Sequence, residues 1–174
     1  IATSSIGPGA LNMVTAAGTA HANRLPVLLI AGDTFTNRLP DPVLQQVEHY
    51  NNPSITVNDA FKAVTRYWDR ITRPEQIIQS LPQALGMMLD PADCGPAFLG
   101  LCQDTQAEAF DYPERFFEPT GHHIPRPRAD VRQVEAAVAL LRTAKKPMII
   151  AGGGVRYADA EAALAAFAQR HAIP

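Results

Sequence analysis

The 174-residue chain is predicted to be an α/β protein in which helices cover a parallel sheet. Short, continuous apolar runs typical of strands buried on both faces alternate with longer segments of helical periodicity. Prolines and glycines stand where these segments begin and end. With 47% hydrophobic and 18% charged residues, the chain has enough apolar material for a core and too few charges for a disordered protein.

The first half of the chain alternates helix and strand. After the glycines of GPGALN, small and apolar residues on one face predict a helix over residues 10–22. The apolar run 27–31 follows as a buried strand. Residues 32–53 are polar and rich in turn residues, which predicts a long loop with a short helical turn at 43–49. The alternating residues 63–71 then predict a second strand.

A further helix and strand complete this half. Thr72 and Glu75 have the spacing of a capping box at the start of a helix that continues to residue 89. Pro82 should bend this helix because it removes one internal hydrogen bond. The apolar run 96–102 is predicted to be the next strand.

The chain is predicted to contain parts of two domains. Residues 104–129 are rich in proline and charge, show no sustained period, and are predicted to be an interdomain linker after a first unit at 1–103. In residues 130–174, Asp130 is the predicted N-cap of a helix, PMIIAGGG predicts a strand and a glycine turn, and another helix follows. Because one strand and two helices cannot close a core, we expect both ends of the chain to be truncated within a larger protein.

Composition excludes several functional classes. The formal net charge is −2 and the Lys and Arg residues are scattered, so we expect no nucleic-acid partner. The longest apolar runs fall far short of the ~20 residues that cross a bilayer, so we expect no membrane span. Cys94 and Cys102 form no CxxC pair, which disfavours a zinc site or a disulfide framework and favours a reduced, cytoplasmic location.

The glycine turn GPGALN has two interpretations. It precedes a helix N-terminus, where unpaired N–H groups can hold an anion. It lacks the Lys of a P-loop and the third Gly of a dinucleotide-binding motif, so spacing alone favours a tight structural turn over a ligand contact. The GGG at 152–154 has the same two interpretations, with a structural turn again favoured.

Other polar residues have structural explanations that compete with functional ones. His122 and His123 suggest a metal pair, but no carboxylate cluster accompanies them, and a solvated linker is favoured. Asp33 follows a buried strand, where α/β proteins bind ligands, yet a capping or turn role is somewhat favoured. Arg66 and Arg70 are interpreted as outward charges on a strand rather than an anion site. The remaining candidates, for which a packing or surface role is favoured, are His21, His49, Ser4, Ser5 and Trp68.

Two long stretches together resemble one family. ATSSIGPGALNMVTAAGTAHANRLPVLLIAGD resembles the second half of the pyrimidine-binding domain of thiamine-diphosphate-dependent enzymes, where a (T/S)xGPGxxN turn opens a helix that ends in xxPVLxIxG. LLRTAKKPMIIAGGGVRYADAEAALAAFAQRHAIP resembles the opening of the central domain of the same enzymes. The resemblance implies that 1–103 is the C-terminal part of the pyrimidine-binding domain, 104–129 the linker and 130–174 the start of the central domain.

Within this superfamily, the stretches RLPDPVLQQVEH and LCQDTQAEAFDYPERFF resemble the hydrolases that cleave a carbon–carbon bond of a cyclic 1,2-dione in myo-inositol degradation. This resemblance implies a cytoplasmic enzyme that acts on a small polyol-derived dione and is a homodimer or homotetramer in its full-length form. An acetolactate-synthase-like carboligase and a non-catalytic ligand-binding module of the same fold remain open as alternatives.

The resemblance also implies a set of cofactor-binding residues. Ser5 and Asn12 correspond to residues near the aminopyrimidine ring of the cofactor, and Gly7 shapes the turn between them. Gln45 in PVLQQ corresponds to a Gln that reaches toward cofactor or substrate, with Gln46 as the alternative if the loop alignment slips by one. The GPG turn therefore seats the pyrimidine end of the cofactor and not its phosphates.

The parts of the family's site that carry the chemistry have no counterpart in the chain. The Glu that activates the cofactor is expected upstream of Ile1, and the GDG motif that holds Mg²⁺ and the diphosphate belongs to a later domain. We therefore assign no catalytic residue in this chain and expect no metal ligand here. By itself this segment should be inactive and bind thiamine diphosphate weakly or not at all.

Overall fold

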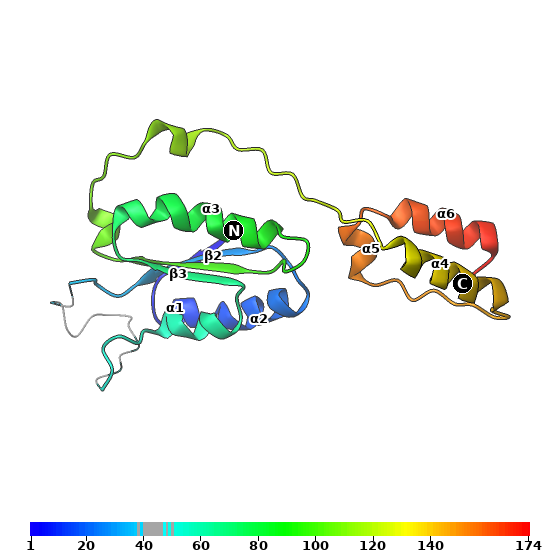
Figure 1. Cartoon of the computed structure of the whole chain (residues 1–174). Coiled ribbons are helices and arrows are strands. Elements are labelled where there is room, and N and C mark those ends of the chain that lie inside the picture. Colours follow the sequence, from blue (N-terminus) through cyan, green and yellow to red (C-terminus); the bar gives the residue numbers. More distant parts are fainter. Residues whose placement is uncertain (38, 40–46, 48, 50) are drawn as a thin grey trace. The chain divides into compact units, whose positions relative to one another are not determined.

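The computed structural model describes residues 1–37, 39, 47, 49 and 51–174 and divides the chain into two compact units, Ile1–His123 and Ile124–Pro174 (Figure 1). The division falls inside the segment predicted as a linker. Each unit is described by itself.

The amino-terminal unit contains a parallel sheet of four strands, which confirms the predicted fold class. The strands lie in the order β1 (Ala2–Ser4), β2 (Leu28–Asp33), β4 (Ala97–Cys102) and β3 (Tyr67–Ile71). In the register, Asp33 is level with Cys102, and Ile71 is level with Leu101. The carboxyl ends of the strands therefore meet at one edge of the sheet.

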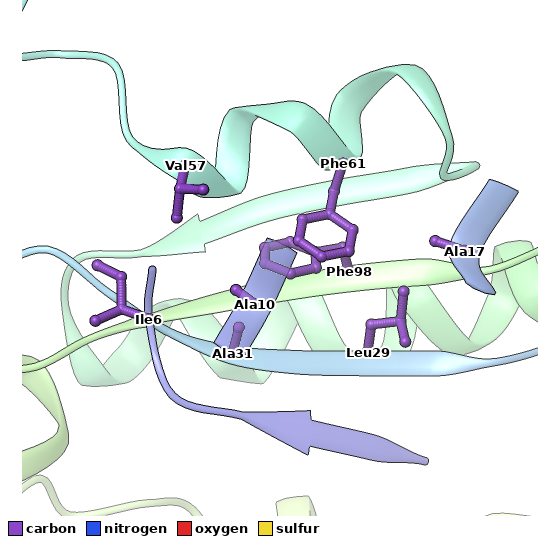
Figure 2. Close-up of a cluster of buried hydrophobic side chains, with 8 residues drawn as sticks. All are labelled: Ile6, Ala10, Ala17, Leu29, Ala31, Val57, Phe61 and Phe98. Carbon is purple, nitrogen blue, oxygen red and sulfur yellow. The ribbon is translucent and has the colours of Figure 1, made fainter. Parts of the chain in front are cut away.

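Helices cover both faces of this sheet. On one face lie α1 (Pro8–Leu11), α2 (Val14–Ala22) and the 3-10 helix η1 (Val57–Ala63), and on the other lies α3 (Ile77–Leu89) (Figure 1). Each face has its own buried core. The first core is formed by Ile6, Ala10, Ala17, Leu29, Ala31, Val57, Phe61 and Phe98 (Figure 2). The second is formed by Leu28, Ile71, Ala84, Ala97 and Leu99.

The first core contains the largest buried side chains. The Phe61 and Phe98 rings stack with their centroids 4.2 Å apart, and Trp68 lies parallel to Phe98 at 6.3 Å. Small residues of α1 and α2, such as Ala10 and Ala17, are buried against the sheet. These small side chains therefore let the helical segment pack closely on the sheet.

Several element boundaries differ from the sequence predictions. The helix predicted over 10–22 is two helices, because the chain ends α1 at Leu11 and starts α2 at Val14. The strand predicted over 63–71 begins only at Tyr67, because η1 occupies 57–63. A reciprocal cap stabilises the start of η1, in which Thr56 accepts from the Asn58 N–H and Asp59 accepts from the Thr56 N–H.

The start of α3 also differs in detail. The short 3-10 helix η2 (Pro74–Gln76) precedes it, and Gln76 rather than Glu75 accepts from the N–H groups of Thr72 and Arg73, at 2.6 and 2.9 Å. The capping interaction is thus one residue later than predicted. The helix continues through Pro82 to Leu89.

The first part of the predicted linker belongs to the amino-terminal unit. It contains the 3-10 helices η3 (Thr105–Ala107) and η4 (Glu114–Phe117). The Tyr112 ring contacts those of Phe110, Phe116 and Phe117, and its hydroxyl donates to the carbonyl of Pro74 at 3.1 Å. An aromatic cluster therefore ties this segment to the start of α3.

The carboxyl-terminal unit consists of α4 (Val131–Thr143), α5 (Gly153–Tyr157) and α6 (Glu161–His171). Asp130 is the N-cap of α4, as predicted, and accepts from the N–H groups of Arg132 and Gln133. The strand predicted in PMIIAGGG is wrong, because this segment has no strand in the structure. A strand needs a neighbour for its N–H and C=O groups. The Ile149 N–H has a single backbone partner, the carbonyl of Pro174.

Across the described residues, no helix combines the length and the apolar character needed to cross a membrane.

Candidate functional site

The turn from Ser5 to Gly7 lies at the carboxyl edge of the sheet, directly after β1. Gly7 is the N-cap of α1 and has φ 78° and ψ −133°, a conformation that residues with a side chain rarely adopt. A Cβ at Gly9 would lie 2.7 Å from Ser5 Oγ, so the missing side chain lets the Ser5 hydroxyl approach the first turn of α1. The glycines therefore shape the backbone around Ser5.

The structure places the predicted cofactor-binding residues as follows. Ser5 and Gly7 share this turn, and Asn12 is the C-cap of α1. The side chains of Ser5 and Asn12 are exposed, and among the described residues neither makes a side-chain hydrogen bond. Gln45 and its alternative Gln46 lie outside the described residues. The donors and acceptors of Ser5 and Asn12 are thus available to a ligand.

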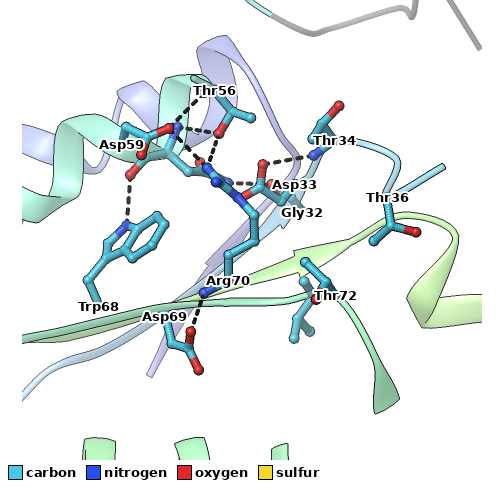
Figure 3. A network of polar contacts seen from close by, with 12 residues as sticks. Gly32, Asp33, Thr34, Thr36, Thr56, Asp59, Trp68, Asp69, Arg70 and Thr72 are labelled. Carbon is cyan, nitrogen blue, oxygen red and sulfur yellow. Dashed lines mark hydrogen bonds and ion pairs between the residues drawn. The ribbon is translucent and has the colours of Figure 1, made fainter. Parts of the chain in front are cut away.

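Beside this turn lies a polar cluster formed by Asp33, Thr56, Asp59 and Arg70, called the Arg70 cluster below (Figure 3). Arg70 Nε donates to Asp33 Oδ2 at 2.8 Å. Arg70 Nη2 donates to Thr56 Oγ1 at 2.8 Å and to Asp59 Oδ2 at 3.0 Å. One guanidinium therefore joins the end of β2 to the start of η1.

The interpretation of Arg70 as an outward charge is wrong. Its side chain is only 19% exposed and its partner Asp33 is fully buried. Gly100 provides the space, because a Cβ at that position would lie 2.6 Å from Asp33 Oδ2. The sequence held one signal of this arrangement, since Arg70 and Trp68 alternate on the strand and so share the face that packs on Phe98.

The charges of the Arg70 cluster compensate one another. Burial raises the pKa of Asp59, but hydrogen bonds from Lys62, the Thr56 N–H and Arg70 outweigh this, so the pKa lies below its ordinary value. Burial lowers the pKa of Arg70, but the carboxylates of Asp33 and Asp59 reverse this and raise it. The guanidinium stays charged and paired, which suits a structural support better than a proton-transfer group.

Asn58 adds a second connection to the end of β2. Its side-chain Nδ2 donates to the carbonyl of Gly32 at 2.9 Å, and its backbone carbonyl accepts from the Trp68 indole at 2.9 Å. Asn58 is fully buried, and its Oδ1 has no hydrogen-bond partner among the described residues. Sequence reasoning missed this residue because nothing local marks an Asn in a 3-10 helix as buried.

Asp104, after β4, holds the segment that follows β2. Its carboxylate accepts from the Thr36 N–H at 2.9 Å, from the Thr36 hydroxyl and from the Asn37 N–H at 3.2 Å. Burial raises the pKa of Asp104, but these hydrogen bonds, that from the Thr36 hydroxyl foremost, bring the pKa below its ordinary value. Sequence reasoning also missed this residue, whose partners lie 67 and 68 residues away.

The other chemical candidates do not assemble into a site. His122 and His123 are exposed. Within the part of the chain that the structure describes, no three His, Cys, Asp or Glu side chains are grouped so that they could hold a metal ion. Both cysteines are buried and unpaired, and burial foremost raises the pKa of Cys102 to about 12. Such a thiol is a poor nucleophile.

Comparison with known proteins identifies the family. The family described as "Thiamine pyrophosphate enzyme, central domain" matches residues 134–174. A 3D-(3,5/4)-trihydroxycyclohexane-1,2-dione hydrolase from Clostridium tetani is 54% identical over 172 residues, 99% of this chain and 27% of the relative. Proteins with the same name from Geobacillus thermodenitrificans and Bacillus subtilis are each 51% identical, over 99% and 98% of this chain.

The chain spans 27% of the length of these curated relatives. The similarity runs through both compact units and is not confined to the segment that the central-domain family matches. The chain therefore belongs to the thiamine pyrophosphate enzyme family, as its sequence resemblance predicts.

Proposed function

We propose that this chain is part of a thiamine-diphosphate-dependent hydrolase that cleaves a carbon–carbon bond of trihydroxycyclohexane-1,2-dione in myo-inositol degradation. The observation that carries this proposal is 54% identity, over 99% of the chain, to a protein named for that reaction. The substrate is then a small, polyol-derived cyclic dione.

In this proposal, residues 1–103 are the C-terminal part of the pyrimidine-binding domain, 104–129 the linker, and 130–174 the start of the central domain. The cofactor-binding residues are Ser5, Gly7, Asn12 and Gln45. An aminopyrimidine ring is a neutral heterocycle with hydrogen-bonding groups on its edge. The exposed hydroxyl of Ser5 and amide of Asn12, on either side of α1, fit such a ring because neither is engaged by another side chain of the described residues.

When bound, thiamine diphosphate supplies the electron sink for carbon–carbon bond cleavage. This chain's own part is to bind and orient. Gly7 sets the backbone direction into α1, Ser5 and Asn12 offer hydrogen bonds to the ring, and Gln45 is assigned to the same site from the sequence resemblance alone. We assign the activating Glu and the Mg²⁺ and diphosphate ligands to other parts of a longer, cytoplasmic protein that forms a homodimer or homotetramer.

The test is an assay of the full-length protein with two substrates. Purified protein, loaded with thiamine diphosphate and Mg²⁺, is given either the cyclic dione or pyruvate, and product formation is followed by mass spectrometry. We expect ring opening of the dione and no acetolactate from pyruvate. Acetolactate formation would instead support a carboligase, and no turnover of either substrate by cofactor-loaded protein would support a non-catalytic module.

A further inference from the structure

We infer that Arg70 is a positioning residue for the cofactor, because it holds the two elements against which the Ser5–Gly7 turn rests. The inference rests on the proposed function, since that function alone brings a cofactor to this turn. Arg70 would act through other residues and would not touch the ligand.

The first support of the turn is the end of β2. Ser4 of β1 is level with Ala31, so the turn leaves the sheet beside Gly32. A Cβ at Gly32 would lie 3.2 Å from the backbone nitrogen of Ile6 and 3.9 Å from the carbonyl carbon of Ser5. The backbone of the turn therefore lies directly on Gly32, and any shift of Gly32 is passed to Ser5.

Arg70 fixes this end of β2. The residue after Gly32 is Asp33, which is fully buried and accepts from Arg70 Nε at 2.8 Å. The other oxygen of Asp33 accepts from the Thr34 N–H at 2.8 Å. The buried carboxylate thus has a single side-chain cation among the described residues, and this ion pair ties the end of β2 to Arg70.

The second support is the start of η1. Arg70 Nη2 binds Thr56 and Asp59, the two residues that cap η1. The first residue of η1, Val57, belongs to the same buried core as Ile6 of the turn. Asn58, the next residue, donates to the Gly32 carbonyl. The two supports are therefore joined to each other as well as to Arg70 (Figure 3).

The guanidinium is suited to this role. It is planar and presents its donors in a fixed fork, so one side chain can bind three acceptors from two elements in a defined geometry. A Lys at this position would offer one compact ammonium group. It would keep the charge opposite Asp33 but lose the fork.

The experiment measures the affinity of the full-length apoprotein for thiamine diphosphate with Mg²⁺, by isothermal titration calorimetry. The variant Arg70→Met should raise the dissociation constant at least about tenfold, since small displacements of the groups that contact the ligand weaken binding strongly. Arg70→Lys should give an intermediate value, a rescue that simple loss of packing would not produce. Circular dichroism confirms that each variant is folded at the temperature used.

The control is Arg66→Met. Arg66 directly precedes the amino end of β3, whereas Arg70 lies near its carboxyl end; the Arg66 side chain is 27% exposed and pairs with Asp93 at 3.2 Å. The Arg66→Met variant should have a lower melting temperature, but its dissociation constant for thiamine diphosphate should stay within about twofold of wild type. Removing Arg70 alone leaves Asp33 buried and unpaired, which can prevent folding. The double variant Asp33→Asn with Arg70→Met leaves no such charge and should show the same loss of affinity.

The outcomes separate this inference from the proposed function. Unchanged affinity in the folded Arg70→Met protein, or in the double variant if the single one does not fold, would overturn the inference. An equal loss in Arg66→Met would overturn it as well. A wild-type protein that binds the cofactor but does not open the dione would overturn the proposed substrate and leave the role of Arg70 intact. A wild-type protein that binds no thiamine diphosphate would overturn both.

Discussion

Two segments of similar sequence, VLLIAGD at 27–33 and MIIAGGG at 148–154, have different structures in the two units. The first contains β2, which pairs with β1 on one side and β4 on the other. The second forms no strand, and Met148 and Ile150 are 69% and 86% exposed. An apolar run therefore specifies a strand only where neighbouring strands complete its hydrogen bonds and cover its faces.

The helices differ in the same way. In the amino-terminal unit, Ala84 of α3 is fully buried, and Ile77, Leu81 and Met88 pack on the sheet. In the carboxyl-terminal unit, α4 has a comparable apolar pattern, yet Val131 and Leu140 are 70% and 73% exposed. No residue described between 124 and 174 is buried. The amino-terminal unit should therefore carry most of the chain's stability.

The largest expected effect comes from emptying the first core. Phe98→Ala removes a ring that is fully buried and stacked on Phe61, and should lower the free energy of unfolding by about 3–5 kcal/mol. The measurement is urea denaturation of the 174-residue chain followed by the fluorescence of Trp68, its only tryptophan. The matched change in the other unit is Val138→Ala, at a side chain that is 40% exposed. It should alter the free energy of unfolding by less than about 1 kcal/mol. Equal losses would contradict the comparison.

Hydrogen exchange should separate the two apolar runs directly. We expect the amides of Leu29 and Ile30 to exchange at least about a hundredfold more slowly than those of Met148 and Ile150, because β2 is paired on both sides. The Ile149 N–H, which donates to the Pro174 carbonyl, should be intermediate. Similar rates in both runs, measured by NMR, would mean that 148–150 is paired in solution.

Two glycine replacements should sharpen the comparison within the amino-terminal unit. Gly100→Ala places a Cβ 2.6 Å from Asp33 Oδ2, which Arg70 holds, and should destabilise the chain by about 1–3 kcal/mol. Gly86 lies in α3, and a Cβ there would meet no described atom within 4 Å, so Gly86→Ala should stabilise the chain by about 0.5–1 kcal/mol. Thermal denaturation distinguishes the two signs, and a stabilising Gly100→Ala would refute the close packing around Asp33.

A further expected effect concerns acid stability. The pKa of Asp104 lies below its ordinary value near 3.8 in the folded chain, so the folded state binds fewer protons than the unfolded state. The stabilisation is present above that ordinary pKa and is lost as the pH falls through the lower, folded-state pKa. Asp104→Asn should cost about 1 kcal/mol at pH 7 and make the loss of stability below about pH 4 less steep. The exposed Asp111→Asn is the control, and an identical response of both variants in pH-dependent urea melts would argue against the contacts of Asp104.

The sequence predicted the parallel sheet because its strands are continuous apolar runs. The predicted strands 27–31 and 96–102 match β2 at Leu28–Asp33 and β4 at Ala97–Cys102 closely. What it could not predict depends on contacts between distant residues. Arg70 is largely covered and paired because Asp33, 37 residues away in the sequence, ends β2 on the far side of β4, and Asp104 has a role because Thr36 lies beside it. The alternation at 63–71 predicted a strand that is too long, because η1, which Thr56 and Asp59 cap, continues to Ala63 and β3 begins only at Tyr67.

At the proposed site, too, the sequence alone could not predict which side chains are free to contact a ligand. Spacing alone favours a structural turn for GPGALN, and the conformation of Gly7 supports that interpretation of its glycines. The exposed, unengaged side chains of Ser5 and Asn12 add what spacing could not, namely that polar groups at this turn remain available. Their roles toward the cofactor stay predictions until binding is measured.

The most direct test is a calorimetric titration of thiamine diphosphate with Mg²⁺ into the full-length protein, its Asn12→Ala and Gln79→Ala variants, and the 174-residue chain alone. Gln79 is exposed on α3, which covers the other face of the sheet, and serves as the control. The account predicts binding to wild type and to Gln79→Ala, about tenfold weaker binding to Asn12→Ala, and weak or no binding to the 174-residue chain. Wild-type affinity in Asn12→Ala, or tight Mg²⁺-dependent binding to the 174-residue chain, would contradict it.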